Sequence, residues 1–281
     1  MFAKKTEQPN IKSENEKRRN RQKEDKMKIR EITDKIAEFA PLELAESWDN
    51  PGLMLGSLSN ECTGVVVALD LTVEVVEQAI ESGCNLIVTH HPFFFVPVKR
   101  IDTDEARGRI VSTLMKHDIT VYSAHTNLDV CENGLCSALA KKIGGYDLQP
   151  NGVGVICNIN ETTLSQFARD VADVLGDGSV RFVGEGDETL RKAFCICGGG
   201  GSNSAYAFAK SVADVFVTGD LKHNIYIDAQ NDGFPIVEFS HYHSEIIVLD
   251  LFEHILADCG VKIIKANQNC PFRVVGGQNE I

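Results

Sequence analysis

Residues 65–92 read VVVALDLTVEVVEQAIESGCNLIVTHHP, and this stretch decides the fold class. It begins and ends with apolar runs, VVVALDL and NLIVT, that are typical of strands buried in a sheet. The segment VEVVEQAIES between them has the apolar spacing of an amphipathic helix. A strand, a helix and a second strand in this order predict a parallel βαβ unit with a right-handed crossover.

The same alternation extends in both directions from this unit. Upstream, Ile29, Ile32, Ile36 and Phe39 recur at helical spacing before Pro41. Downstream, ITVYSA, DVFVTGD and PIVEFS predict further strands between helical segments. We therefore predict a two-lobed, three-layer α/β protein with mostly parallel sheets. Its predicted parts are a disordered, charged extension at 1–26, a first lobe at 27–150 and a second lobe at 151–281.

The charge of the chain is unevenly distributed. Its net charge is −12, yet the first 30 residues hold 11 lysines and arginines against 5 acidic residues. An acidic body repels nucleic acid and favours cations, so we expect no direct DNA or RNA binding by the folded part. The basic segment could be a nucleic-acid arm or a targeting peptide, but its mixed charges favour a solvated extension.

The composition also indicates the cellular compartment of the protein. No run of about 18 apolar residues occurs, so neither a membrane span nor a secretory signal is expected. The nine cysteines lie mostly in apolar segments such as AFCIC, which is typical of reduced, buried thiols. We therefore expect a cytoplasmic protein.

Histidines and carboxylates follow two strands of the predicted first lobe. His90 and His91 end the strand NLIVT, and His125 and Asp129 follow ITVYSA. Ligands of open parallel sheets bind in the crevice at the carboxyl ends of the strands, so these side chains are expected to share a crevice. Because neighbours on a strand point to opposite sides, His90 and His91 suit two adjacent ions better than one.

A third cluster, SHYHSE at 240–245, follows the strand PIVEF. Its His241 and Glu245 are four residues apart and lie on one face of a helical turn, whereas His243 lies on another. The last part of the second lobe is thus expected to return these two side chains to the crevice. Imidazoles beside carboxylates accept Zn²⁺, Mn²⁺, Fe²⁺ or Mg²⁺, and we predict two such ions per chain.

Each cluster also has a plain structural interpretation. The two adjacent histidines could hydrogen-bond in a polar loop, Asp129 could cap a helix, and Glu245 suits the first turn of a helix because of the helix dipole. Three clusters at separate strand ends in an acidic protein favour the metal site over these alternatives.

Two further motifs are weaker. GGGGSN at 198–203 stands between a predicted strand and a predicted helix, where it could hold phosphate or be a plain turn. The pairs Cys131/Cys136 and Cys195/Cys197 have no second pair at zinc-finger spacing and are interpreted as core residues.

Five motifs in order resemble the NGG-interacting-factor-three-like family, whose members are often labelled type-two GTP cyclohydrolase I homologues. The resemblance covers about residues 27–264. It implies a two-lobed α/β protein with a dinuclear metal centre, assembled as a ring-shaped homohexamer. The motifs are WDNPGLMLG, VVVALDLTVEVVEQAIESGCNLIVTHHPFFF, VYSAHTNLD, DVFVTGDLKHN and SHYHSE.

The resemblance implies a ligand set. His91 and Asp129 would hold one ion, His90 and His241 would hold the other, and Glu245 would bridge them.

The resemblance also implies that His125 lies beside the site, where it either supports the ligands or faces the substrate. At one position the sequence departs from the family, because Asn224 stands where a histidine is usual, with His223 one residue earlier. No role in proton transfer can be carried over to that position.

We predict a metal-dependent hydrolase of the GTP cyclohydrolase type, which opens a cyclic amidine C–N bond of a nucleotide substrate. His125 and Glu245 are the candidate catalytic residues, and His223 is a second candidate for proton transfer. The alternative is a non-catalytic hexameric scaffold that binds or delivers metal ions, or that presents surfaces to regulatory partners.

Overall fold

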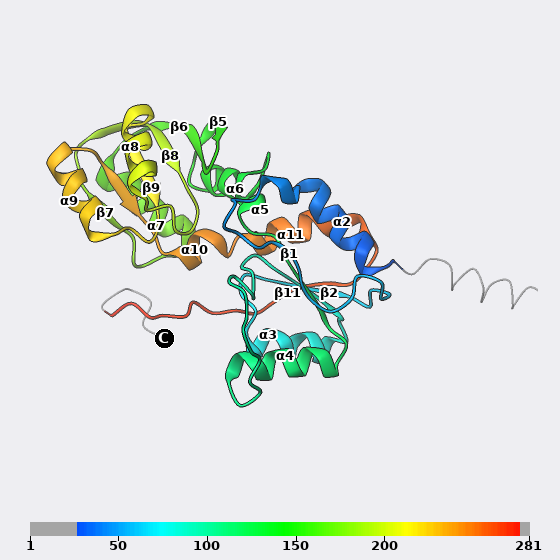
Figure 1. The fold of residues 1–281 in the computed structure, drawn as a ribbon. Coiled ribbons are helices and arrows are strands. Elements are labelled where there is room, and N and C mark those ends of the chain that lie inside the picture. Colours follow the sequence, from blue (N-terminus) through cyan, green and yellow to red (C-terminus); the bar gives the residue numbers. More distant parts are fainter. Residues whose placement is uncertain (1–26, 276–281) are drawn as a thin grey trace, which may run out of the picture.

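The computed structural model describes residues 27–275 and contains two β-sheets with helices packed against both (Figure 1). The predicted extension at 1–26 lies outside the described residues. The predicted α/β class is confirmed. Within residues 27–275, no helix is long and apolar enough to span a membrane.

Five strands form the first sheet: β1 (Gly52–Leu55), β2 (Val65–Ala68), β3 (Leu86–Thr89), β4 (Thr120–Ser123) and β11 (Ile263–Lys265). Their order is β1-β4-β3-β2-β11. β4, β3, β2 and β11 run parallel, and β1 is antiparallel to β4 at one edge. The predicted βαβ unit is therefore present, with β2 and β3 paired directly.

Helices cover both faces of this sheet and make three layers (Figure 1). Val66 and Ala68 pack in an apolar cluster with α3 (Val73–Ser82) and α4 (Ala106–Lys116). Val65 and Val67 belong to the other cluster, with α2 (Ile29–Phe39) and α11 (Val248–Leu256). Side chains of a strand alternate between the two faces, so an uninterrupted apolar run fits a sheet that is buried on both sides.

The helix predicted before Pro41 is α2. Ile29, Ile32 and Ile36 are fully buried on its inner face, as their spacing predicts, and the helix ends at Phe39. The burial of three large apolar side chains fixes α2 on the sheet, because each contributes about 1.5–3 kcal/mol relative to exposure.

Six strands form the second sheet: β5 (Tyr146–Asn151), β6 (Gly154–Thr163), β7 (Arg181–Val183), β8 (Thr189–Cys195), β9 (Val215–Thr218) and β10 (Ile236–Glu238). Their order is β5-β6-β8-β9-β10-β7. Only β8, β9 and β10 run parallel, and the remaining pairs are antiparallel. The mostly parallel arrangement thus holds in the first sheet, whereas the second is mixed.

The antiparallel start of the second sheet has a local cause. Asn151 pairs with Gly154, which leaves a two-residue hairpin loop in which Gly152 has φ +53°. A two-residue loop joins only antiparallel strands, and glycine is favoured at its first position because it adopts a positive φ readily. The hairpin therefore determines the direction of β6.

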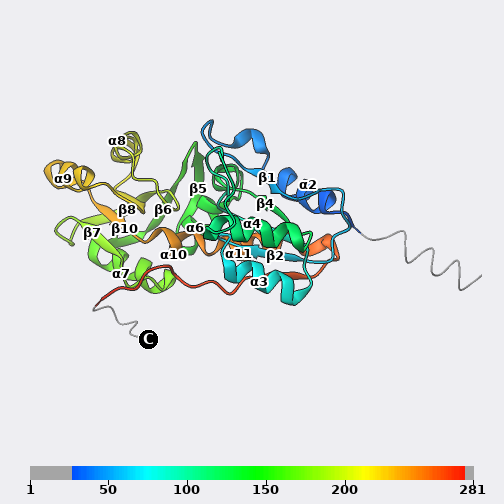
Figure 2. The ribbon, with the colours of Figure 1, turned by 60° about the horizontal axis from the view of Figure 1, so that its bottom comes forward.

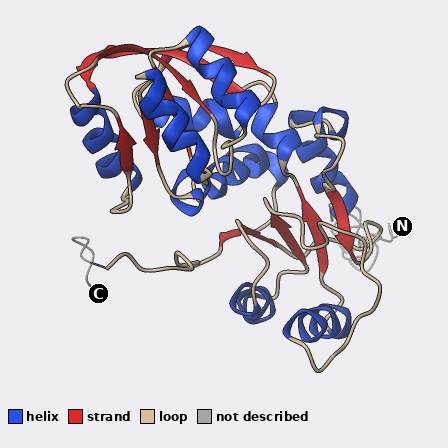
Figure 3. Cartoon of the chain, turned by 60° about the vertical axis from the view of Figure 1, so that its left-hand side comes forward, coloured by secondary structure: helices blue, strands red, loops and turns tan. Residues whose placement is uncertain are grey.

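The remaining helices connect these strands and join the two sheets, which stand apart in Figure 3. They are α5 (Thr126–Val130), α6 (Leu135–Lys142), α7 (Leu164–Leu175), α8 (Asn203–Val212), α9 (His223–Asp232) and α10 (His241–Glu245), with short 3-10 turns at Leu42–Leu44 and Ala257–Cys259.

After the second sheet the chain returns to the first. The helical stretch after β10 is divided into α10 and α11, because the amides of Leu249 and Asp250 bond to carbonyls three residues back and tighten the chain between the helices. β11 then pairs in parallel with β2. Figure 2 shows the C-terminal tail, in red, leaving the first sheet and running past α10.

Candidate metal centre

The structure brings together every residue predicted as a metal ligand. His90 and His91 directly follow β3, Asp129 lies on α5 after β4, and His241 and Glu245 lie at the two ends of α10 after β10. All three strands are parallel strands of their sheets, and their carboxyl ends meet where the two sheets face each other. The predicted convergence at strand ends is therefore found.

Two groups of donors share Glu245, and His90 and His91 also form a third group with His125. In the first group, Glu245 Oε2 lies 2.9 Å from His91 Nε2 and 2.9 Å from His241 Nε2. In the second group, His90 Nε2 lies 3.4 Å from Asp129 Oδ1 and 3.8 Å from Glu245 Oε1. The ligand atoms of each group lie within 4.8 Å of one another, which is close enough to converge on one ion.

This grouping differs from the pairing that the resemblance implies. The geometry places His91 with His241, and His90 with Asp129, whereas the resemblance pairs His91 with Asp129 and His90 with His241. The reason is directional: the two ring centroids lie only 5.1 Å apart, but Nε2 of His91 faces α10, while Nε2 of His90 faces Asp129 on α5.

Aspartates orient three of the histidines. Nδ1 lies 2.7 Å from a carboxylate oxygen in each of these pairs: His91 with Asp70, His241 with Asp220, and His125 with Asp49. A carboxylate holds the proton on Nδ1 and leaves Nε2 with a lone pair for a ligand, which is the usual second partner of a metal-binding histidine. The sequence motifs did not identify any of the three aspartates as a partner of a histidine, although Asp70 and Asp220 each follow the end of a strand.

His90 is oriented in the same way by the backbone. Its Nδ1 donates to the carbonyl oxygen of Ala124 at 2.8 Å, so Nε2 carries the lone pair. This ring is fully buried, and among the described residues its Nε2 is the buried side-chain nitrogen that has no hydrogen-bond partner. A buried polar atom without a partner is costly, and a cation between His90, Asp129 and Glu245 would satisfy it. The residues present therefore fit a metal ion.

The centre needs positive charge. Burial alone would lower the pKa of His91, but hydrogen bonds to Asp70 and Glu245 outweigh it and raise the pKa to about 10. In His241, burial is likewise outweighed by Glu245 and Asp220, and the pKa rises to about 9. Burial would raise the pKa of Glu245, but the surrounding imidazoles hold it well below its ordinary value. Protons or cations must therefore balance these carboxylates, and they compete for the same sites.

Two cysteines support Asp129, a contact that the sequence analysis missed. Cys197 Sγ donates to Asp129 Oδ1 at 3.2 Å and lies 3.1 Å from Cys136 Sγ. The contact with Cys136 and burial raise the pKa of Cys197 well above its ordinary value, so the thiol keeps its proton. Cys197 thus helps to fix the direction of the carboxylate rather than serving only as core.

The glycine segment 198–203 lets the backbone approach Glu245. A Cβ atom on Gly198 would lie 1.9 Å from Glu245 Oε1, and Gly198 has φ +58°. Gly198 N donates to Ser244 Oγ at 2.9 Å, and Gly200 N donates to Thr218 Oγ1 at 3.1 Å. These two amides are used inside the protein and do not face a ligand.

Two other predicted positions lie apart from the centre. His223 is exposed at the start of α9, and Asn224 Nδ2 bonds to Asn203 Oδ1 at 3.1 Å. Neither residue lines the cavity beside the centre. His243 points to Ser240 Oγ at 2.6 Å, in agreement with its placement on a different helical face.

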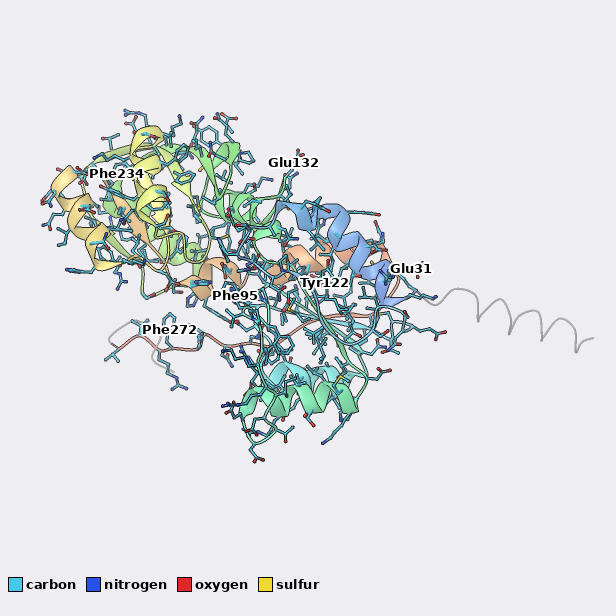
Figure 4. All side chains as sticks on the ribbon, in the orientation of Figure 1. Glu31, Phe95, Tyr122, Glu132, Phe234 and Phe272 are labelled. Atoms are coloured by element: carbon cyan, nitrogen blue, oxygen red, sulfur yellow. The ribbon has the colours of Figure 1, made fainter. Side chains whose placement is uncertain are left out.

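The centre opens into a cavity of about 550 Å³. His91, His125, His241 and the carboxylates form its polar end, while aromatic and aliphatic side chains form most of its walls. Trp48 and Phe95 lie at this wall, with ring centroids 5.6 Å apart, and each lies 6.2 Å from the ring of His125. Figure 4 shows Phe95 near the junction of the two halves of the molecule.

The C-terminal tail ties the two sides of the centre together. Gln268 accepts from Leu69 N at 2.7 Å and donates to the carbonyl oxygen of Asp70 at 2.9 Å. The backbone carbonyl oxygen of Gln268 accepts a hydrogen bond from Tyr242 Oη at 2.8 Å. Asp70 orients His91, and Tyr242 is the neighbour of His241, so one residue links both supports.

Comparison with known proteins agrees with this fold. A family model described as Duf34/NIF3 (NGG1p interacting factor 3) matches residues 27–271. A Clostridium perfringens relative named "GTP cyclohydrolase 1 type 2 homolog" is 34% identical over 234 residues, covering 79% of this chain and 88% of that protein. A relative of the same name from Streptococcus pneumoniae is 34% identical over 228 residues, covering 78% and 86%.

Solved structures show the same arrangement. A hypothetical protein of Staphylococcus aureus is 30% identical and superposes with a TM-score of 0.82, covering 89% of this chain and all of that one. Reduced HcgD from Methanocaldococcus jannaschii is 32% identical with a TM-score of 0.77, covering 86% of this chain and 98% of that one.

Proposed function

The chain belongs to the Duf34/NIF3 (NGG1p interacting factor 3) family, and we propose that it is a metal-dependent hydrolase built around two divalent ions. The observation that carries the proposal is the position of Glu245. One of its oxygens faces His91 and His241, and the other faces His90. A carboxylate shared by two donor groups is the arrangement that suits a dinuclear site.

Each of the two donor groups that share Glu245 would hold one ion. His91 and His241 would hold one ion, His90 and Asp129 would hold the other, and Glu245 would serve both. Two divalent ions in such a site lower the pKa of water and polarise the bond under attack. Imidazole and carboxylate donors suit Zn²⁺, Mn²⁺ or Fe²⁺ better than the all-oxygen shell that Mg²⁺ prefers.

His125 is the residue suited to move protons. Asp49 holds its Nδ1 proton at 2.7 Å, so Nε2 is the ring nitrogen left to accept a proton from attacking water. The same nitrogen can then return the proton to a leaving nitrogen. The relatives named as GTP cyclohydrolase homologues suggest a cyclic amidine C–N bond as the bond that is broken.

Metal analysis and a hydrolysis panel test this proposal together. We expect about two ions per wild-type chain, and turnover of at least one nitrogen-heterocyclic substrate after metal loading. Glu245→Gln should lose at least one ion and about a hundredfold or more in turnover, since metal and charge stabilisation each contribute several kcal/mol. Glu253→Gln is the matched control, because Glu253 is exposed on α11 and pairs with Lys265.

The outcomes separate the two candidate functions. Two ions with no product across a broad panel would contradict the hydrolase and favour a non-catalytic metal-binding scaffold. A chain that binds no divalent ion would contradict both.

We also propose that the chain assembles as a homohexamer, as the family resemblance implies. Leu42, Leu44 and Leu53 support an interface, because each exposes 40% or more of its surface and Leu42 lies beside the strand that carries Leu53. Light scattering after size exclusion should give about six times the chain mass of 30.9 kDa. A monomer in solution would contradict this part of the proposal.

A further inference from the structure

Three rings gather at the cavity wall. Trp48 is 56% exposed and Phe95 is 45% exposed, yet each packs against the ring of His125. Single exposed apolar side chains are ordinary, but aromatic rings grouped at the mouth of a cavity offer a stacking surface. The surface lies directly beside the residue proposed to move protons.

The charge of the cavity limits what can enter. Glu46, Asp129 and Glu245 line it, and none of the described residues that line it is a lysine or an arginine. Two divalent ions would leave these three carboxylates with little excess positive charge. A nucleoside triphosphate carries several negative charges, and burying them without cationic partners is costly.

The glycine segment does not supply the missing partners. Besides the amides of Gly198 and Gly200, Ser202 N donates to the carbonyl oxygen of Gly200 at 2.8 Å, and Ala205 N donates to Ser202 Oγ at 3.1 Å. The amides of Gly198, Gly200, Ser202 and Ala205 are therefore already used within the protein. Phosphate groups would find no side-chain cation among the described residues there, and every second amide of the segment is taken.

We propose that the cavity binds a planar, uncharged nitrogen heterocycle, of the size of a purine base or its nucleoside, stacked against Trp48 and Phe95. Nucleoside triphosphates bind less well, because the described lining residues place three carboxylates beside the site and offer their phosphates no lysine or arginine. This inference rests on the proposed function, since the stacked ring is the hydrolase's substrate. A cavity of about 550 Å³ has the volume typical of small-molecule sites.

Binding is tested with guanosine and GTP, which share a ring and differ in the triphosphate. The chain holds a single tryptophan, so the fluorescence of Trp48 reports stacking directly. The full chain is loaded with Zn²⁺, and GTP is supplied with equimolar Mg²⁺ so that it does not strip the metal. We expect guanosine to quench Trp48 and to bind at least about tenfold more tightly than GTP. Equal or tighter binding of GTP, or no quenching by guanosine, would overturn the inference.

A pair of phenylalanine variants tests the aromatic wall. Phe95 and Phe272 are both 45% exposed, but Phe272 lies on the C-terminal tail away from the cavity (Figure 4). Phe95→Ala removes one stacking ring, so this variant should bind guanosine about tenfold more weakly than wild type. Phe272→Ala should stay within about twofold of wild type. Equal effects of the two variants would show that Phe95 does not form part of the binding surface.

A further variant tests whether the negative charge of the lining disfavours phosphate groups. Glu46→Gln removes one negative charge from the lining, and the preference for guanosine over GTP should narrow by several-fold. A preference that does not change would show that the lining does not exclude the phosphates.

Binding and turnover are measured separately, so the two proposals can fail independently. Guanosine binding without product would support the heterocycle site and contradict the hydrolase. Turnover of GTP with no preference for guanosine would support the hydrolase and overturn the heterocycle inference.

Discussion

Asp70 accepts a hydrogen bond from Nδ1 of His91 at 2.7 Å, and this contact decides which nitrogen of the ring faces Glu245. Asp70 itself is half-exposed and touches no other candidate ligand. Its effect on the metal centre therefore passes through the orientation and basicity of one imidazole.

We expect Asp70→Asn to weaken metal binding about 10- to 100-fold, because the loss of an orienting carboxylate typically has an effect of this size. Competition with a coloured chelator at constant pH measures the change. Asp250→Asn is the control, since Asp250 is an exposed aspartate that pairs with Lys265. An unchanged affinity in Asp70→Asn would show that the backbone alone orients His91.

The buried carboxylate of Asp49 should make stability depend on pH. Burial would raise its pKa, but hydrogen bonds from His125 and Thr126 outweigh it and lower the pKa to about 2. A lowered pKa stabilises the fold above the ordinary value of 3.8, and this contribution is lost as the pH falls toward 2. Asp49→Asn should therefore lose about 2 kcal/mol at pH 7 and much less near pH 2. Urea unfolding at both values tests this, and an equal loss at the two values would contradict it.

The contact between the C-terminal tail and the first sheet should stabilise both the fold and the metal centre. Gln268→Ala leaves the buried amide of Leu69 without its acceptor, so we expect a loss of about 1–3 kcal/mol in unfolding free energy. Metal affinity should fall as well, because Asp70 loses a support. Asn267→Ala is the neighbouring control, since the hydrogen bonds of Asn267 to Gln78 use its backbone. Equal behaviour of the two variants would argue against a tie through Gln268.

Gly198 should tolerate no side chain. In Gly198→Ala the new methyl group would displace Glu245, and the left-handed backbone would be strained, so the variant should bind less than half of the wild-type metal. Gly199→Ala is a control in the same segment, because the nearest atom to its Cβ is 3.4 Å away. Elemental analysis after dialysis decides the matter, and a fully loaded Gly198→Ala protein would refute the steric argument.

The sequence predicted the convergence of the candidate ligands well because these residues follow strand ends. His90, His91 and His241 stand next to strands whose apolar runs are visible in the sequence, and parallel strands bring such positions to one edge. The orienting aspartates follow the same rule, yet a single aspartate after a strand looks like an ordinary turn residue. The role of Asp220 in orienting His241 becomes apparent only from the short distance between the two side chains.

Other features could not be read from local pattern. β5 exposes most of its residues, and in β1 only Gly52 is buried, so neither behaves as the buried strand that a long apolar run identifies. The direction of pairing in the second sheet depends on which strands become neighbours. The contacts of Cys197 with Cys136 and of Gln268 with Leu69 join residues 61 and 199 positions apart, which no local spacing encodes.

The late position of β11 in the chain has a consequence for synthesis. β2 gains its outer neighbour only when residues 263–265 have left the ribosome, long after β2 itself has been made. Until then the nascent chain carries an open sheet edge, which is a template for pairing with another chain. The imidazoles after β3 are made early, whereas their partners on α10 follow 150 positions later, so the set of candidate ligands is incomplete until α10 has been synthesised.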